Sequence, residues 1–556
     1  MIRPQGRVLV LKQNTKREQG RKAQLANIQA SKAIADIVRT TLGPSSMLKM
    51  LLDPLGGIVL TNDGNAILRE VDVVHPAART MIELSRTQDE EVGDGSTSVV
   101  VLAGEVLSNA VDLLEKHQLH PSIISHGYML ALEDALKYMR EIAIEVDTHD
   151  DEKLRQVVDA CLSTKFSSRW EGRLSRIAIE AVKQVDITLP NGKKEIDIRR
   201  YAKVEKIPGG ELEESRVLDG VMVNKDITHA KMRRYIVNPK VLLLDCPLEY
   251  KKGESQTYVE ITKEEEWSKL LEQEEKEVRA MCDDIIASGC NVVITEKGVS
   301  DLAQHFLVKA GISCIRRVRK TDNNRIARVT GATIVNRTEE ITAEDVGTKC
   351  GLFEIKKIGD EYFMFLTKCK EKGACTILLR GGSKDVLNEV ERNLQDAMNV
   401  TRNILLEGKL LPGGGSVEMA VSARLLANVK NVDSVKQYPY RAVANALEVI
   451  PRTLAQNCGT SVVKVMTELR SKHAPCSADS VKYGVDGETG AIIDVVQEQI
   501  WDSLAVKQQI FKTAIEAAAM LLRIDDVLSG VRKEGGGSGG DNPDMDPETF
   551  GDARDG

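Results

Sequence analysis

The sequence predicts a multidomain protein of α and α/β structure, in which helical segments near both ends of the chain enclose an α/β segment. Two observations lead to this prediction. Residues 20–140 and 382–526 carry apolar side chains mostly at helical spacing, whereas residues 240–380 contain short β-branched or Leu-rich runs separated by helical patterns. Such alternation is typical of a partly parallel sheet. The two helical ends are therefore expected to form one domain, with the α/β part nested between them.

The helices of the first segment have clear start and stop signals. Residues 23–38 show helical periodicity and end before Gly43-Pro44, a stop signal. Pro76 opens a second helix, because proline is favoured in the first helical turn. A third helix is expected over residues 99–114, after a Gly-rich break.

The central segment is expected to hold five strands. They are predicted over residues 240–245, 291–295, 312–315, 332–335 and 376–380, with a helix over 299–310 between two of them. Residues 263–286 form a Glu-rich amphipathic helix whose apolar stripe includes Trp267, Val278 and Ile285. The Gly-rich, acidic segment 531–556 is expected to be disordered.

Composition limits the classes of function. The 556 residues are 42% hydrophobic and 29% charged, typical of soluble globular proteins. The net charge of −7 argues against nucleic acid as a partner, and apolar runs fall short of the ~20 residues of a membrane helix. Ten scattered cysteines without a CxxC motif fit a reducing, cytoplasmic compartment. Cys369 and Cys375 could pair across a hairpin, but two free thiols are expected in a cytosol.

The segment Gly93-Asp94-Gly95-Ser96-Thr97-Ser98 offers the strongest indication of chemistry. A polar break before an apolar run places unpaired N–H groups at a helix N-terminus, which attracts phosphate. Asp94 adds an oxygen ligand of the kind that Mg²⁺ prefers. On these residues alone, a solvated turn with a capping Asp or Ser is the better interpretation. The chain lacks GxxxxGK[ST], and the segment fails GxGxxG, so neither a P-loop nor a Rossmann site is indicated.

Several distant segments accompany this one. They are Leu42-Gly43-Pro44, Thr61-Asn62-Asp63-Gly64, Asp396 in its helical pattern, Pro412-Gly413-Gly414-Gly415, and Tyr483-Gly484 followed by Asp494. In this order and spacing they resemble the group II chaperonins, from about residue 8 to residue 530. The resemblance implies a chaperonin fold. A helical equatorial ATP-binding domain would comprise 1–150 and 405–530, and a small intermediate hinge domain 151–217 and 375–404. An α/β apical substrate-binding domain would comprise 218–374, with a helical lid protrusion at about 250–288.

The resemblance also implies a role for each motif residue, with ATP and Mg²⁺ as cofactors. Asp94 would bind Mg²⁺, and the phosphates would contact Gly95, Ser96, Thr97 and Ser98. The family more often has Thr at the position of Ser96, and Ser keeps the hydroxyl. The remaining nucleotide-binding positions would be Gly43, Pro44, Ser163, Thr164, Lys165, Gly414, Gly415, Gly484 and Asp494, with Lys165 sensing the γ-phosphate and Asp494 bonding the ribose.

Two acids would complete catalysis. Periodicity alone favours a surface ion pair between Asp396 and Arg392 at i,i+4. The resemblance instead implies that Asp396 orients the attacking water from a domain that swings onto the nucleotide. Asp63 would be a second acid near that water, and it also suits an Asn-Asp-Gly turn.

The resulting hypothesis is an ATPase subunit of a cytosolic double ring that encloses and folds unfolded polypeptides, such as cytoskeletal proteins. Its partners would be the other subunits of a hetero-oligomer. Clients would meet the helix over 299–310, whose outer face is expected to present Asp301, Gln304, His305, Val308 and Lys309. The alternatives are an ATP-dependent ligase or kinase, for which the sequence shows no acceptor pocket, and an inert nucleotide-binding assembly subunit.

Overall fold

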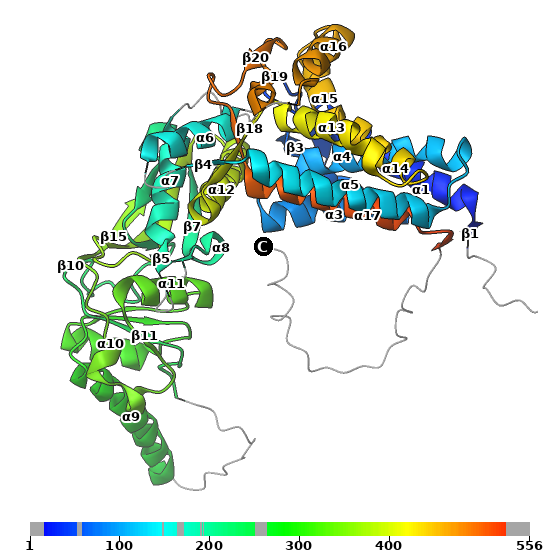
Figure 1. The fold of residues 1–556 in the computed structure, drawn as a ribbon. Helices are drawn as coiled ribbons and strands as arrows, with labels where there is room; N and C mark the ends of the chain where they lie inside the picture. Colours follow the sequence, from blue (N-terminus) through cyan, green and yellow to red (C-terminus); the bar gives the residue numbers. More distant parts are fainter. Residues whose placement is uncertain are drawn as a thin grey trace, which may run out of the picture.

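In a computed structural model, residues 16–52, 58–146, 150–163, 172–188, 192, 194–250, 264–476 and 478–529 are described. The molecule is a bent arm with a helical body at one end, a small mixed part at the bend and an α/β part at the other end (Figure 1). The predicted class of mixed α and α/β structure is confirmed.

The helical body brings the two ends of the chain together. Its core lies along α4 (Ser96–Glu115), where Val99, Val100, Val101 and Leu102 are fully buried. By length and composition α4 could cross a membrane, but 61% of its apolar window is buried inside the protein, as in a core helix. Helices from both chain ends contribute to the same core: α1 (Arg21–Arg39), α2 (Gly64–Glu70), α3 (Pro76–Glu91), α5 (Pro121–Ile142), α13 (Ser416–Asn428), α14 (Gln437–Leu447), α15 (Val449–Asn457), α16 (Val462–His473) and α17 (Leu504–Leu522).

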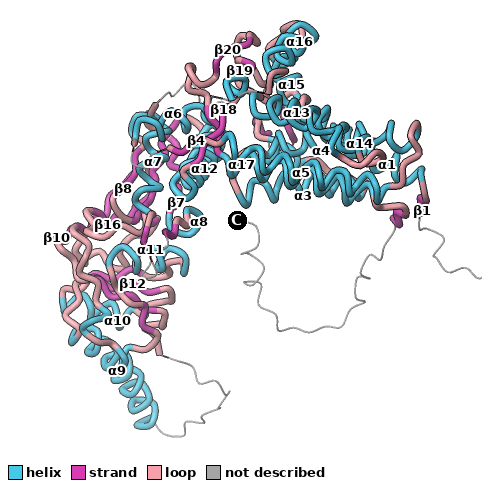
Figure 2. Tube along the Cα trace, viewed as in Figure 1, coloured by secondary structure: helices cyan, strands magenta, loops and turns pink. Residues whose placement is uncertain are grey.

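Short strands join the body's two halves (Figure 2). β1 (Lys16–Gln19) pairs antiparallel with β22 (Asp526–Ser529), and β18 (Lys409–Pro412) lies between β21 (Trp501–Ser503) and β4 (Ile144–Glu145). Two antiparallel hairpins complete the body: β2 (Lys49–Leu52) with β3 (Ile58–Thr61), and β19 (Tyr483–Val485) with β20 (Ile492–Asp494). The strands β18 to β22 interrupt the helical pattern expected after residue 382.

The part at the bend combines two stretches of sequence. Helices α6 (Asp151–Ser163), α7 (Arg173–Val185), α8 (Ile198–Tyr201) and α12 (Lys384–Glu407) share one buried cluster with strand β17 (Cys375–Gly381). β17 pairs parallel with β7 (Ala202–Pro208) and antiparallel with β8 (Arg216–Leu218), and β5 (Ile187–Thr188) pairs with β6 (Lys194–Glu195).

The outer part contains two sheets. Four of the five predicted strands form a parallel sheet in the order β13 (Ser313–Ile315), β12 (Val292–Thr295), β11 (Val241–Leu244) and β14 (Ile334–Val335), while the fifth is β17. Helices α9 (Glu264–Ala287), α10 (Asp301–Ala310) and α11 (Lys320–Thr330) contribute to the same core. An antiparallel sheet that the sequence analysis missed has the order β10 (Tyr235–Val237), β15 (Leu352–Ile358), β16 (Glu361–Thr367) and β9 (Val221–Val223).

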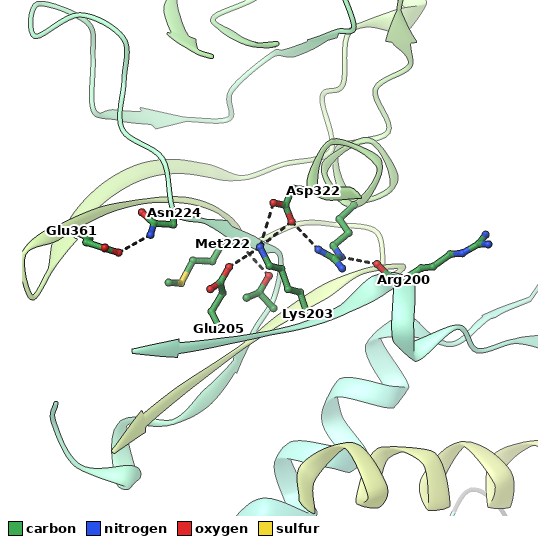
Figure 3. Close-up of polar contacts among 9 residues, drawn as sticks. Arg200, Lys203, Glu205, Met222, Asn224, Asp322 and Glu361 are labelled. Atoms are coloured by element: carbon green, nitrogen blue, oxygen red, sulfur yellow. Dashed lines mark hydrogen bonds and ion pairs between the residues drawn. The ribbon is translucent and has the colours of Figure 1, made fainter. Parts of the chain in front are cut away.

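A buried ion network holds α11 against β7 (Figure 3). The Asp322 carboxylate accepts from Lys203 Nζ at 3.0 Å and from Arg325 at 2.7 Å. Lys203 also pairs with Glu205 at 2.6 Å. The side chain of Asp322 is only 3% exposed. The bend and the outer part are therefore joined by a buried ion pair, and the removal of either partner would leave an unpaired buried charge.

One sequence expectation, the outward position of Gln304, differs from the structure. Gln304 does not face outward on α10: it is buried, and its amide donates to the Val299 carbonyl at 3.2 Å. Cys375 is buried in β17, with its thiol directed at the Ala181 carbonyl, and Cys369 lies at the far end of the β15–β16 hairpin. All ten cysteines are free thiols, as expected.

Candidate functional site

A cavity of about 290 Å³ lies where segments from four distant parts of the sequence meet. Its walls come from the turn after α1, the start of α4, the end of α6, and several segments between residues 400 and 510. Ten of the predicted nucleotide-binding residues line it: Gly43, Pro44, Asp94, Gly95, Ser96, Thr97, Ser98, Ser163, Gly414 and Gly415. Thr164 and Lys165 lie outside the described residues.

The loop before α4 has the geometry of an anion site. Gly95 is the N-cap of α4 in the left-handed conformation (φ +77°) and makes no side-chain cap, so the first-turn N–H groups are not capped by it. The Asp94 carboxylate accepts from the Gly95 N–H at 2.7 Å, and the Gln88 amide donates to the Asp94 carbonyl at 2.9 Å. The uncapped helix end and the carboxylate therefore line the same cavity.

Asp63 lies directly beside this loop. It caps α2 by accepting from the N–H groups of Asn65 and Ala66, as the turn interpretation predicted. Its side chain also contacts the first residue of α4, because the Ser96 hydroxyl donates to Asp63 Oδ1 at 3.0 Å. Asp63 does not itself line the cavity and lies behind Ser96, which does.

Helix α12 docks against the same loop from the bend. Arg402 and Asn403 donate to the carbonyls of Glu91 and Val92, both at 2.8–2.9 Å. Gly93 (φ +74°) faces Asn399 so closely that an added Cβ would lie 2.0 Å from its Nδ2. Further along, Thr61 donates to Glu389 at 3.3 Å.

Asp396 lies between these two points of docking. It is buried, at 9% exposure, so it does not belong to a surface ion pair. Arg392 pairs with Glu389 instead, at 2.8 Å. Burial raises the pKa of Glu389, although the charge of Arg392 opposes this rise. Val400, one turn after Asp396, lines the cavity, whereas Asp396 itself does not.

The Gly-rich turn forms the opposite wall. The Gly414 carbonyl accepts from the Val485 N–H at 2.8 Å, and an added Cβ on Gly484 would lie 3.0 Å from that carbonyl. Gly484 thus packs behind Gly414 rather than lining the cavity. Asp494 is also absent from the lining: it accepts from the Val496 N–H at 3.1 Å, and Lys482 lies 4.0 Å away.

The sequence analysis missed a buried charge cluster at the cavity wall. Lys507 on α17 pairs with Glu418 at 2.6 Å and with Asp502 at 3.0 Å. Burial lowers the pKa of Lys507, but the two carboxylates outweigh it and raise the pKa overall. Lys507 and Asp502 both line the cavity, which therefore holds a permanent cation. No sequence signal marks these residues, because they are about ninety positions from Glu418 and follow no motif.

Other lining residues were also missed. Asn62 lies within a quoted motif, whereas Cys161, Asp486 and Glu488 carry no motif at all. The Cys161 thiol is 4.0 Å from Asp94 Oδ2. Gly487 meets Pro44 so closely that an added Cβ would be 2.3 Å from the proline ring, which closes the cavity at that side.

The donor set fits a magnesium–nucleotide better than a protein-held metal. Among the residues that the structure describes, no three or more His, Cys, Asp and Glu side chains are grouped to hold a metal ion. Mg²⁺ commonly uses one or two carboxylates together with phosphate oxygens and water. Asp94 at an uncapped helix end supplies a carboxylate of this kind.

Comparisons with known proteins agree with one another. A model of the TCP-1/cpn60 chaperonin family matches residues 34–532. A protein of Oxytricha granulifera named T-complex protein 1 subunit gamma is 60% identical over 556 residues, 99% of each chain. Proteins of the same name from Drosophila melanogaster and Homo sapiens are 61% and 59% identical, each over 95% of this chain and 96% of the relative.

Proposed function

This chain belongs to the TCP-1/cpn60 chaperonin family, which confirms the resemblance found in the sequence, and from this premise we propose that it is a gamma-type subunit of a hetero-oligomeric chaperonin (CCT/TRiC) of the cytoplasm. In this proposal it binds and hydrolyses ATP with Mg²⁺, and the resulting movement encloses and folds polypeptide clients. The single observation that carries the proposal is the convergence of ten motif residues on one cavity.

We assign distinct tasks to the residues around the cavity. Asp94 would hold Mg²⁺, and the N–H groups and hydroxyls of residues 95–98 would bind the phosphates. Mg²⁺, when bound, would neutralise phosphate charge and so favour attack by water. Asp396 would orient that water, with Asp63 supporting the loop through Ser96. We propose that Gly484 and Asp494 support the cavity from behind its lining residues, and that either would contact the nucleotide only after a local shift of this segment.

The domain division is proposed on the same basis. Three of the four buried clusters among the described residues support it: one joins residues 28–139 to 411–522, another joins 154–202 to 375–410, and a third spans 221–374. The fourth, a small cluster, packs the bend against the outer part, with Ile207, Leu218 and Leu378 on one side and Met222, Phe363 and Phe365 on the other. We therefore assign the equatorial domain to 1–150 and 405–530, the intermediate domain to 151–217 and 375–404, and the apical domain to 218–374. α12 would then carry Asp396 onto the nucleotide from the intermediate domain.

The β2–β3 hairpin supports assembly with other subunits. It is a two-stranded sheet whose outer side chains are apolar and solvent-exposed, Leu52 at 74% and Met50 at 68%. An isolated two-stranded hairpin is marginal in water, and an exposed apolar strand edge is a site for pairing with another chain. We propose that neighbouring subunits cover it. The apolar run of residues 9–11, which we also expect to pair as a strand with another subunit or with its own domain, lies outside the described residues.

Clients would be captured by the apical domain. The outer face of α10 carries Asp301, Leu302, His305 and Lys309, which are exposed and of mixed polarity. A mixed surface favours selective binding of particular clients. The charged helix α9 would contribute to the lid, where Trp267 is 56% exposed.

The test compares two acids at this subunit's own site. In assembled particles, Asp396→Ala should leave ATP bound and slow its hydrolysis about 10²–10⁴-fold, because a water-positioning acid acts only in the transition state. Asp94→Ala should lose bound nucleotide as well, because a metal ligand acts in the ground state. Gln395→Ala, an exposed neighbour on α12, is the control and should behave as wild type.

The readout must be specific to this subunit, because others would continue to turn over ATP. Structures of particles frozen at intervals after ATP addition give the ratio of ADP to ATP in this cavity. Normal conversion in Asp396→Ala would overturn the catalytic assignment. A particle that assembles but binds no nucleotide here, even as wild type, would instead favour an inert assembly subunit.

A further inference from the structure

Two cysteines face each other across the base of the β15–β16 hairpin. The ladder pairs Leu352 with Thr367, and three residues further the Lys370 N–H donates to the Lys349 carbonyl at 3.0 Å. Cys350 precedes β15 and Cys369 follows β16, so the two cysteines face each other between these two pairings. The chains remain close there, because a Cβ added to Gly351 would be 2.7 Å from the Lys368 carbonyl.

The two thiols influence each other's ionisation. The Cys350 thiol donates to the carbonyls of Leu352 and Thr367 at 3.4 and 3.6 Å, and the Cys369 thiol donates to the Leu366 carbonyl at 3.8 Å. The neighbouring Cys350 and burial raise the pKa of Cys369, whereas the neighbouring Cys369 lowers the pKa of Cys350. Cβ atoms of directly opposed residues lie about 4.5–5.5 Å apart, and a disulfide needs about 3.5–4.5 Å. A small local shift therefore suffices for a covalent bond.

The two cysteines differ in solvent exposure, and this difference assigns each a separate role. Cys350 is 1% exposed, whereas Cys369 is partly exposed and flanked by the exposed side chains of Lys368 and Lys370. Positive charge attracts anionic thiol reagents. Cys369 is thus the accessible sulfur and Cys350 the internal one.

The pair also lies where the chain crosses between the bend and the outer part. Residues 368–374 lead from β16 of the outer sheet to β17 of the bend. The Cys369 N–H donates to the carbonyl of Asp219, which belongs to the other crossing, between β8 and β9. A disulfide between Cys369 and Cys350 would therefore link the 368–374 crossing covalently to the segment that leads into β15 of the outer sheet.

We propose that Cys350 and Cys369 form a reversible dithiol–disulfide site that exchanges with small-molecule disulfides such as oxidised glutathione. Disulfides in cytosolic proteins are typically transient and redox-sensing. Its assignment is independent of nucleotide hydrolysis, because it rests on the pairing geometry of the outer sheet alone.

The chemistry balances in two exchange steps. Cys369, which is accessible to the reagent, loses its proton and attacks one sulfur of oxidised glutathione, which forms a mixed disulfide and releases one glutathione thiolate. The Cys350 thiolate then attacks the Cys369 sulfur, forms the Cys350–Cys369 bond and releases the second glutathione thiolate. The two cysteines lose two protons and two electrons, and one oxidised glutathione becomes two reduced molecules.

The experiment equilibrates the assembled complex with mixtures of reduced and oxidised glutathione. Free thiols are then alkylated, and the chain is digested without reductant for mass spectrometry. We expect a peptide pair joined through Cys350 and Cys369 that appears as the mixture becomes oxidising and disappears on reduction. Hydrogen exchange of residues 368–374 should slow about tenfold or more in the oxidised form, because the crosslink limits local opening.

Variants identify the partners. Cys369→Ser should abolish the crosslink, and Cys350→Ser should leave a glutathione adduct on Cys369. Cys375→Ala is the matched control and should retain the crosslink. A crosslink between Cys369 and Cys375, or full alkylation of Cys350 and Cys369 in the most oxidising mixture, would overturn the proposal, and wild-type protein alone decides both outcomes.

Discussion

Replacing Gly93 by Ala should separate the docking of α12 from nucleotide binding. Gly93 has φ +74°, and an added Cβ would lie 2.0 Å from Asn399 Nδ2 and 2.4 Å from Asn399 Cβ. The left-handed strain of about 1–2 kcal/mol is present whether α12 is docked or not, so it reduces stability but does not change docking. The collision exists only in the docked arrangement.

The size of the effect follows from that difference. Overpacking a well-packed contact costs about 1–3 kcal/mol, which corresponds to about a 5- to 160-fold loss of the docked population. If Asp396 acts only when α12 is docked, Gly93→Ala should slow hydrolysis at this site by a similar factor while ATP remains bound. The assay is again the ratio of ADP to ATP in this subunit's cavity over time.

The chain offers a matched control at Gly459. It has the same φ of +74°, but an added Cβ would meet nothing within 4 Å. Gly459→Ala should therefore lose stability without slowing hydrolysis. Adding Asn399→Gly to Gly93→Ala should restore hydrolysis, apart from about 1 kcal/mol of helix stability. Equal rates for Gly93→Ala and Gly459→Ala would refute the idea that docking of α12 limits hydrolysis.

Three further predictions concern the framework. Asp322→Ala should destabilise the contact between α11 and β7 by about 3 kcal/mol, because Lys203 loses a buried partner; faster hydrogen exchange of α11 would report it. Burial lowers the pKa of His473, whose Nε2 lies 2.8 Å from the Tyr483 carbonyl. The unfolded chain then binds more protons, so the stability of α16 on β19 should fall as the pH drops through about 6.5. Hydrogen exchange of β19 should show this loss, and His473→Gln should not. Leu52→Lys should weaken assembly without unfolding the chain, and an unchanged particle yield by native mass spectrometry would count against the hairpin interface.

Much of the fold was predictable because its signals are local. α1, α3 and the strands β11, β12, β13 and β14 each carry their own periodicity or β-branched run, so the nested arrangement of helical and α/β parts followed from the sequence. The β15–β16 hairpin was missed because its burial does not alternate cleanly: β16 buries four consecutive residues, and no apolar–polar pattern marks it. Gln304 was misplaced for a related reason, since helical spacing places a residue on a face but does not say how far the neighbouring sheet extends over it.

The candidate site divides in the same way. Asp94 and Gly414 were predicted as site residues through the resemblance of their motifs to the family, and both line the cavity. Lys507 and Asp502 were not predicted, because their place in the cavity depends on α17 packing against α4 and on β21 pairing with β18. Lysine is rarely buried in a protein core, and the two carboxylate partners of Lys507 compensate for the free-energy cost of burying its charge.

The position of Asp396 shows how packing can reverse an interpretation from spacing. At i,i+4 from Arg392 it fits a surface ion pair, and nothing in the helix itself argues otherwise. The structure buries Asp396 and directs Arg392 to Glu389, while Arg402 and Asn403 fasten the same helix to the loop before Asp94. A buried carboxylate on a helix that is attached to the loop before α4 by two hydrogen bonds to its carbonyls is sensitive to whether the helix is docked. The contacts of α12 with this loop, which cannot be predicted from helical spacing, are also those through which domain movement would control hydrolysis. A substitution at Gly93 disturbs these contacts and leaves Asp396 in place, so it tests the coupling more directly than a substitution of Asp396.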